Sequence, residues 1–324
     1  MERRMVTVSQ LSDIPYLKNS VVTVGTFDGV HLAHQQLLRD VADRARARDG
    51  RSVVLTFEPH PKEVLTGQPM QLLTSLEERR QICEQLGIDL FFRIEFTYDF
   101  SRQTSREFYL RYVVQGCGVS EVVEGYDHHF GRDREGSVEA LLGLGREFEF
   151  TVAALKPVYI DEEIVSSSQI RQHLLHGRVD RAQRLLGRAY SISGTVIRGD
   201  GRGRQLGYPT ANLHLSTSRK LIPSNGIYFA QVDIGGPMYF GMVSIGVRPT
   251  FYEQGKRMVE VYLLDFDGDL YGQTIGVQFL KRLRDERKFE SAQQLIEQMD
   301  RDKEESRKLE TEFRIHLKQE QHKN

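Results

Sequence analysis

The chain has 324 residues, of which 39% are hydrophobic and 27% charged, a composition typical of a globular protein large enough for two domains. Its formal net charge of −1 gives no electrostatic reason to expect binding to nucleic acid or to an anionic membrane. The sequence lacks an apolar stretch suited to a signal peptide or a membrane span, and Cys83 and Cys117 are too few for a disulfide framework. We therefore expect a cytoplasmic protein.

The first half of the chain alternates short apolar runs with helical patterns, which predicts a parallel α/β sheet. Ligands bind beyond the carboxyl ends of the strands in such sheets. The segments after the strands that end at Val24, Phe57 and Val123 should therefore meet at one edge. Strands are predicted at 21–24, 53–57, 90–94, 121–123 and 148–155, and helices at 75–86, 104–115, 168–176 and 179–186.

The segment after the first strand combines two glycines with two histidines. Gly25 and Gly29 let the backbone approach a ligand or adopt a positive φ. His31 and His34 share one face of the opening helical turn, where free N–H groups and the helix dipole favour an anion such as phosphate. Such histidines can instead cap or pack against the helix, and a zinc site would need a third ligand such as His60.

Two further segments follow strands at the same predicted edge. Prolines on both sides of His60 make the backbone rigid, which suits either a ligand contact or a stiff loop. The loop 125–136 is rich in glycine, arginine and polar side chains. Asp127 is suited to accept a hydrogen bond from a ribose or a base, and Arg132 or Arg134 to meet a phosphate. A solvated charged loop would have the same composition.

A run of serines at 166–168 precedes the helix predicted at 168–176. One serine is expected to cap the helix, and the remaining hydroxyl and N–H groups, with Arg171, would form a second anion site. Two such helix starts at one sheet edge suit a triphosphate. The chain has no Gly-x-x-x-x-Gly-Lys-Ser/Thr motif, so it is not a P-loop enzyme.

After residue 187 the pattern changes to strands without helices between them, which predicts an antiparallel barrel or sandwich. A helix that packs on this structure is predicted from residue 291, with a frayed end rich in lysine and glutamate. The expected domains are 1–187 and 188–324. The strands of the second half are predicted at 191–197, 227–234, 239–245, 258–264 and 274–280.

The second half also carries residues suited to phosphate and metal chemistry. A glycine–arginine loop at 199–207 suits phosphate binding, although a flexible hairpin has the same composition. Thr210 and Asn212 face the same way in an extended chain, and their neutral oxygens suit Mg²⁺. Glu260 lies in mid-strand on a largely apolar face, either as a base aimed at a hydroxyl or as a core charge paired with an arginine.

Together these segments resemble the family of bifunctional prokaryotic riboflavin kinase/FMN adenylyltransferases, also called FAD synthetases, over nearly the whole chain. The segment 25–34 resembles the family's form of the His-x-Gly-His nucleotidyltransferase signature, with Ala33 in place of the usual glycine. Glu260 falls where the family places its kinase base. The other matching segments are 57–61, the flavin- and nucleotide-site loop 125–136, the serine motif 166–171 with Ser168 in place of a usual threonine, and the Pro-Thr-Ala-Asn motif within 207–212.

The resemblance implies an α/β nucleotidyltransferase domain with a Rossmann-like parallel sheet, followed by an antiparallel β-barrel kinase domain and a C-terminal helix. It implies that ATP phosphorylates riboflavin to FMN and then adenylylates FMN to FAD with release of pyrophosphate, with Mg²⁺ as cofactor. The expected partners are then riboflavin, FMN and ATP, without nucleic acid or membrane, and self-association stays open. The alternatives are a riboflavin kinase with an impaired first domain and a non-catalytic flavin- or nucleotide-binding regulator.

The resemblance also implies roles for individual residues. Glu260 would act on the riboflavin 5′-hydroxyl, and Thr210 and Asn212 would help to place Mg²⁺. His31 and His34 would stabilise the charge that grows on the transferred and leaving phosphates. The residues implied to hold phosphates are Gly25, Phe27, Asp28, Gly29, Ser167, Ser168, Arg171, Gly201, Arg202, Gly203 and Arg204. Those implied to contact the flavin or the nucleotide are Pro59, His60, Asp127, Phe130, Arg132 and Tyr208.

Overall fold

The computed structural model describes residues 4–125, 138–199, 202–247 and 257–321. The chain divides into two compact units, Met1–Ser167 and Ser168–Asn324. The second unit takes in nearly all of helix α7 (Ser167–Leu175) and the whole of helix α8 (Val179–Leu186). The domain boundary expected between residues 187 and 188 stays a prediction.

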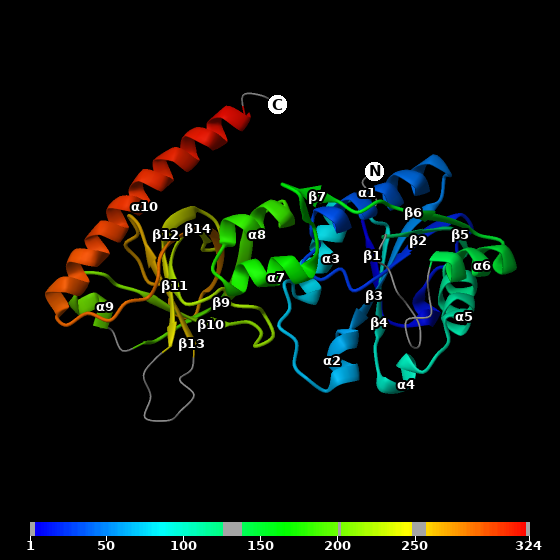
Figure 1. Ribbon diagram of the computed structural model, residues 1–324, viewed down its shortest axis with the longest axis horizontal. Helices are drawn as coiled ribbons and strands as arrows, with labels where there is room; N and C mark the ends of the chain where they lie inside the picture. The colour runs from blue at the N-terminus through cyan, green and yellow to red at the C-terminus, as the bar shows by residue number, and fades with distance from the viewer. Residues whose placement is uncertain (1–3, 126–137, 200–201, 248–256, 322–324) are drawn as a thin grey trace. The chain divides into compact units, whose positions relative to one another are not determined.

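The first unit is built on a six-stranded sheet whose described strands all pair in parallel (Figure 1). Its strand order is β1–β4–β3–β2–β5–β6, which confirms the predicted parallel α/β sheet. The strands are β1 (Val6–Val8), β2 (Ser20–Val24), β3 (Arg51–Glu58), β4 (Leu90–Glu95), β5 (Val119–Glu124) and β6 (Thr151–Ala154).

Helices cover both faces of this sheet, so its central strands are buried on both sides. Along β2, Val22 and Val24 belong to one apolar cluster and Val21 to the other, since successive side chains point to opposite faces. The helices are α1 (Leu32–Ala47), α2 (Pro61–Thr66), α3 (Leu76–Gln85), α4 (Tyr98–Ser101), α5 (Ser105–Phe108) and α6 (Val138–Phe148), with a 3₁₀ turn (Leu11–Asp13), a π-helix (Tyr109–Gly116) and a hairpin of β7 (Tyr159–Ile160) and β8 (Glu163–Ile164).

Two predicted elements of the first unit differ from the structure. The helix expected at 104–115 is the short α5 followed by the π-helix Tyr109–Gly116. The strand expected at 148–155 begins only at Thr151, because α6 runs to Phe148 and Glu149 then adopts a positive φ of 61°. The residues after α6 pass close to the last turns of that helix. A Cβ on Gly145 would lie 2.6 Å from the carbonyl oxygen of Phe150.

The second unit contains a closed antiparallel barrel with the strand order β10–β13–β12–β11–β14–β9, so the barrel alternative is confirmed. Alternate residues of β13, Val259, Val261 and Leu263, are buried in its interior. Sequence patterning missed β10, in which Asn212 and His214 interrupt the apolar run. The strands are β9 (Tyr190–Ile197), β10 (Ala211–Leu215), β11 (Gly226–Asp233), β12 (Met238–Val247), β13 (Arg257–Leu263) and β14 (Thr274–Arg284), with a short helix α9 (Arg202–Gln205) before β10.

A long helix, α10 (Ala292–Gln321), packs along the barrel and contacts β12 (Figure 1). Arg284 of β14 donates through Nε and Nη2 to the buried carboxylate of Asp302, at 2.7–3.0 Å. The sequence predicted a frayed C-terminal end, and this prediction is wrong as far as Gln321, where α10 ends. Ion pairs between side chains one turn apart, such as Glu304 with Lys308, support the helix.

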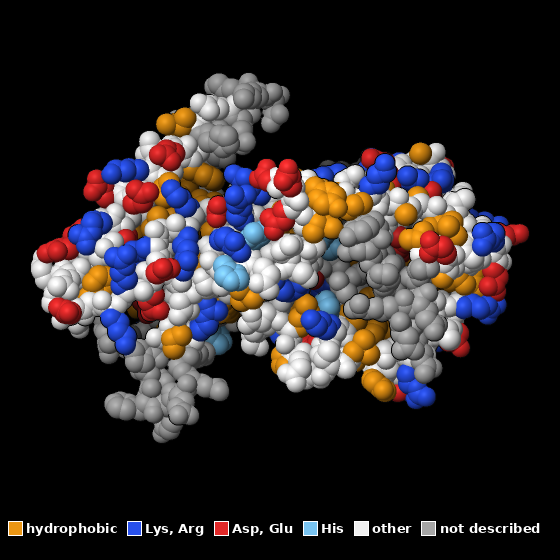
Figure 2. Space-filling view, viewed as in Figure 1, with side chains coloured by type: hydrophobic (Ala, Val, Ile, Leu, Met, Phe, Trp, Pro, Cys, Tyr) orange, Lys and Arg blue, Asp and Glu red, His pale blue; other side chains and the backbone are white. Residues whose placement is uncertain are grey.

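Figure 2 shows both signs of charge interspersed along α10. The polar surface of α10 distinguishes it from a membrane helix. Within the described ranges, no helix combines the length and apolar character that crossing a membrane requires.

We expect Asp302→Ala to lower the free energy of barrel opening by about 3 kcal/mol, because it leaves the largely covered Arg284 without its carboxylate. Hydrogen exchange of the barrel strands, followed by mass spectrometry, measures this free energy within the second unit. The matched control is Asp265→Ala, which removes the exposed ion pair with Arg307 and should cost less than about 1 kcal/mol. Equal effects of the two substitutions would contradict the anchoring role of Asp302.

Candidate functional site

The carboxyl ends of β3, β2 and β5 lie side by side, because these strands are neighbours in the parallel sheet. This confirms that the segments that begin at Gly25, Pro59 and Gly125 start from one edge. Residues 126–137 lie outside the described part of the chain. The roles expected for Asp127, Phe130 and Arg132 therefore stay predictions.

The turn after β2, residues 25–31, has an unusual backbone. Phe27, Gly29 and Val30 have φ angles of +48°, +87° and +36°. Such angles cost little at glycine but are unfavourable for a β-branched residue such as Val30. The ring of Phe27 is buried and lies over Gly25, where a Cβ would come within 3.0 Å of it. Other groups must hold this conformation in place.

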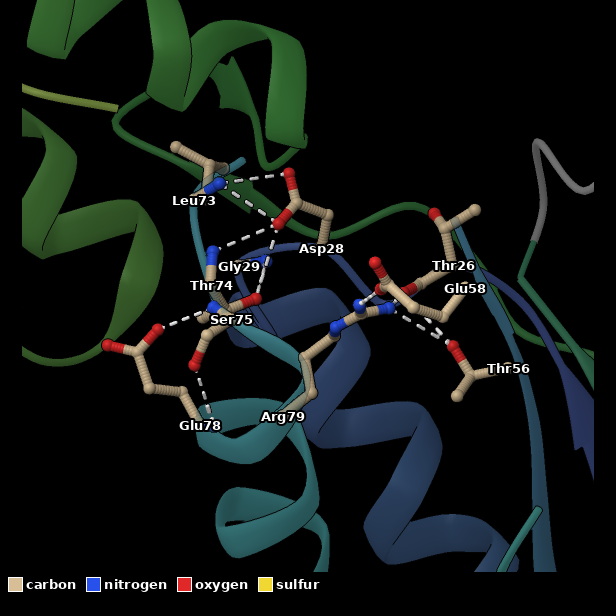
Figure 3. A network of polar contacts seen from close by, with 10 residues as sticks. All are labelled: Thr26, Asp28, Gly29, Thr56, Glu58, Leu73, Thr74, Ser75, Glu78 and Arg79. Atoms are coloured by element: carbon tan, nitrogen blue, oxygen red, sulfur yellow. Dashed lines mark hydrogen bonds and ion pairs between the residues drawn. The ribbon is translucent and has the colours of Figure 1, made fainter. Parts of the chain in front are cut away.

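The side chain of Asp28 is one of these holding groups (Figure 3). It is 1% exposed, and its carboxylate accepts hydrogen bonds from the backbone N–H groups of Leu73 and Thr74, at 3.0–3.1 Å. The hydroxyl of Thr74 also lies 3.2 Å from this carboxylate and accepts from the N–H of Gly29 at 2.8 Å. The carboxylate thus ties the turn to the segment before α3, a contact that the sequence did not indicate. A phosphate contact by Asp28 stays a prediction.

The two histidines lie together at the start of α1, which confirms that they share one face. Their rings stack with centroids 3.6 Å apart, and the Nδ1 atom of His31, the N-cap residue, accepts from the His34 N–H at 3.4 Å. The Nδ1 atom of His34 is buried and has no hydrogen-bond partner among the described residues. Burial, and then the neighbouring His31, lower the pKa of His34 well below its ordinary value. His34 is therefore neutral at pH 7.

The second predicted helix start meets the same turn through Ser167, whose hydroxyl donates to the carbonyl oxygen of Asp28 at 2.8 Å. Ser168 lies in the first turn of α7 and Arg171 at the start of the second; both belong to the second unit, and their contacts with a nucleotide stay predictions. His60 is the N-cap of α2, and its Nδ1 atom accepts from the N–H of Lys62 at 3.1 Å. Pro59 precedes it after a cis peptide bond with Glu58.

The zinc alternative finds no support in the described residues. None of their His, Cys, Asp and Glu side chains form a group of three that could hold a metal ion.

A second polar site lies on the barrel, at the start of β10 and in the middle of β13. Asn212 and Glu260 are partners across these strands, and the Thr210 hydroxyl donates to Oε2 of Glu260 at 3.2 Å. The structure thus brings together the three residues that the sequence singled out. The core-charge alternative for Glu260 is wrong, because Glu260 lies between the buried Val259 and Val261, on the opposite and partly exposed face of β13.

Glycines let the preceding loop pass directly against this site. A Cβ on Gly199 would lie 2.1 Å from Nδ2 of Asn212, and one on Gly203 would lie 2.3 Å from the carbonyl oxygen of Tyr208 and 3.1 Å from the hydroxyl of Thr210. Side chains at these positions would displace the site residues. Gly201 lies outside the described residues, and phosphate contacts by it and by the side chains of Arg202 and Arg204 stay predictions.

Helix α10 completes this site with residues that the sequence analysis missed. The buried Tyr208 donates its hydroxyl to Asp300, and its ring lies 5.1 Å from that of Tyr262. The Lys303 ammonium lies 5.8 Å from both ring centroids. Burial, and then Asp300, raise the pKa of Tyr208, so this side chain stays neutral. No local motif marks Asp300 or Lys303, because their role follows from where α10 docks.

Two family models together match most of the chain. The model described as FAD synthetase matches residues 13–169, and the model described as riboflavin kinase matches residues 186–310. Each match contains one of the two sites described above.

Curated relatives are similar over nearly their whole length. A bifunctional riboflavin kinase/FMN adenylyltransferase of Pseudomonas fluorescens is 39% identical, over 87% of this chain and 90% of that protein. One from Bacillus subtilis (strain 168) is 35% identical, over 89% of this chain and 91% of that protein. Among solved structures, a Streptococcus pneumoniae protein named as a macrolide-efflux protein is 34% identical with a TM-score of 0.85, over 94% of this chain and 99% of that one.

The lowered pKa of His34 gives a prediction for the ligand-free protein. We expect the NMR signal of its imidazole to stay at the neutral position well below pH 6.5 in the folded chain, but to titrate near pH 6.5 in urea. His34→Gln identifies the signal. Because only the unfolded state takes up this proton, acidification through pH 6.5 should also lower the free energy of unfolding. A folded-state midpoint at or above pH 6.5 would rule out the buried, neutral ring.

Proposed function

The chain belongs to the family of bifunctional riboflavin kinase/FMN adenylyltransferases, and on this premise we propose how its residues carry out the two reactions. The enzyme transfers a phosphoryl group from ATP to riboflavin, which gives FMN, and then joins FMN to the AMP part of ATP, which gives FAD and pyrophosphate. The observation that carries the residue assignments is that each family match contains a separate polar site with side chains suited to one of these reactions.

For the kinase reaction, we assign Glu260 to the 5′-hydroxyl of riboflavin, which it orients or deprotonates. The Thr210 hydroxyl donates to Glu260 and so holds the carboxylate in place. The oxygens of Thr210 and Asn212, close to this carboxylate, are hard ligands that fit Mg²⁺. When bound there, Mg²⁺ would neutralise charge on the ATP phosphates. The loop 199–207 would cover these phosphates, and Tyr208 would contact the flavin.

For the second reaction, the FMN phosphate attacks the α-phosphate of ATP and expels pyrophosphate, so no protein nucleophile is required. We assign His31, His34 and the N–H groups at the start of α1 to the charge that develops on the transferred and leaving phosphates. A neutral imidazole such as His34 can donate one N–H to a phosphate oxygen. Ser167, Ser168 and Arg171 would hold the far phosphates, and the segment 59–60 would contact the flavin.

The substrates are riboflavin, FMN and ATP, and we propose that the enzyme meets them in the cytoplasm. Cys83 and Cys117 are both free and buried thiols, which agrees with a reducing compartment.

We expect Glu260→Ala to abolish FMN formation from riboflavin and to leave the conversion of FMN to FAD intact. Incubation with ATP, Mg²⁺ and either flavin, with FMN and FAD resolved by chromatography, measures both steps. Glu297→Ala, an exposed acidic position on α10, is the control and should retain both activities. Loss of both activities in Glu260→Ala would refute the assignment of two separate sites. FMN without FAD from the unmodified chain would instead indicate an impaired first site.

We expect His31→Ala to lower the rate of FAD formation from FMN on the order of a hundredfold, the effect of removing one donor to the transition state. The kinase activity of the same chain is the internal control and should not change. An unchanged rate of FAD formation would assign the histidines to packing.

A further inference from the structure

Arg79 of α3 is a buried arginine to which neither the sequence motifs nor the proposed reaction gives a role. Its side chain is 3% exposed. Nη1 donates to the carbonyl oxygen of Thr26 at 2.7 Å and to the hydroxyl of Thr56 at 3.3 Å, and Nη2 donates to Oε2 of Glu58 at 2.5 Å (Figure 3). One guanidinium thus joins three acceptors from two separate segments of the chain.

These acceptors come from the two segments to which the proposed function assigns the ATP phosphates and the flavin. Thr26 belongs to the turn that leads to His31, and Glu58 is the last residue of β3, directly before Pro59 and His60. The Thr56 hydroxyl also lies 3.3 Å from the carbonyl oxygen of Thr26 and so closes the network. Arg79 therefore links the turn after β2 (residues 25–31, the phosphate turn) to the end of β3 and to residues 59–60 (the flavin segment).

The start of α3 is stabilised by its own hydrogen bonds, so it can hold the segments that bind to it in place. Ser75 and Glu78 form a capping box: the Ser75 N–H donates to the Glu78 carboxylate at 2.6 Å and the Glu78 N–H to the Ser75 hydroxyl at 3.1 Å. The residue before this box, Thr74, bonds to Asp28 and Gly29. Both ends of the stretch Thr26–Gly29 are thus tied to one helix start, and that stretch contains a residue with an unfavourable positive φ, Phe27.

We infer that Arg79 is a positioning residue for adenylyl transfer, which sets the phosphate turn and the flavin segment at the separation that the reaction needs. The inference rests on the assignment of these two segments in the proposed function. The FMN phosphate must lie in line with the α-phosphate of ATP, and a displacement of about 1 Å can cost roughly a hundredfold in rate. Arg79 acts through Thr26 and Glu58 rather than by contact with either substrate.

Two variants test the inference without leaving Glu58 as an unpaired buried charge. Arg79→Lys keeps a positive charge beside Glu58 but loses the planar fork that joins several acceptors. The double variant Arg79→Met/Glu58→Gln removes both charges together. For each we expect kcat for FAD formation to fall on the order of a hundredfold and KM for FMN to rise, while riboflavin kinase activity stays unchanged. The matched control is Arg80→Met, the next residue on α3, which pairs with Glu77 and Glu84 at the surface and should behave as the unmodified chain.

Rates are normalised to the folded fraction of the first unit, measured by hydrogen exchange of its sheet. A loss of rate that only follows this fraction, with KM for FMN unchanged, would show that Arg79 is structural and would overturn the inference. Wild-type kcat and KM in either variant would also overturn it. His31→Ala, assayed alongside, separates the assignment of the phosphate turn from the role of Arg79. If His31→Ala keeps the wild-type rate, the assignment of the phosphate turn is refuted. If His31→Ala is slow but both Arg79 variants keep the wild-type rate, only the role of Arg79 is refuted.

Discussion

The attachment of the turn after β2 to the start of α3 is the interaction on which the chemistry of the first unit depends. The turn holds two non-glycine residues with positive φ, Phe27 and Val30, so its shape does not follow from local preference. The carboxylate of Asp28, the hydroxyl of Thr74 and the guanidinium of Arg79 supply the support from outside the turn. Because these bonds are buried, water does not compete with them, and the N–H groups at the start of α1 are presented in one fixed direction.

The residues of the barrel site are also held in defined positions, but by different interactions. There, the paired backbones of β10 and β13 set Asn212 opposite Glu260, and two glycines allow the neighbouring loop to come within contact distance. Regular hydrogen-bonded strands need little side-chain support, so close backbone approach defines most of this site and the bond between Tyr208 and Asp300 completes it, whereas the first site depends on side-chain bonds. The difference follows from the two folds. A parallel sheet covered by helices can place site residues only in the loops at its edge, whereas an antiparallel barrel can also place them on the outer face of its strands.

Much of this organisation could be predicted from the sequence. Apolar periodicity located most strands and some of the helices, although it missed α2 and α6, and it separated the parallel sheet from the barrel. The membership of Thr210, Asn212 and Glu260 in one site followed from residue type together with the resemblance, and the shared face of the two histidines followed from their spacing. The partners of Asp28 and Tyr208 could not be predicted, because they lie 45 and 92 residues away along the chain and no local pattern encodes them. Arg79 was missed for the same reason, since within its helix it resembles the surface arginine beside it.

The bond between Tyr208 and Asp300 has a consequence for the order in which the activities arise during synthesis. The first unit is contiguous and is made in full by Ser167, so it can fold while translation continues. The kinase site, in contrast, waits for β14 to close the barrel and for α10 to emerge from the ribosome and deliver Asp300 and Lys303. A nascent chain therefore contains all the residues assigned to the second reaction, the last of which is Arg171, before it contains those assigned to the first.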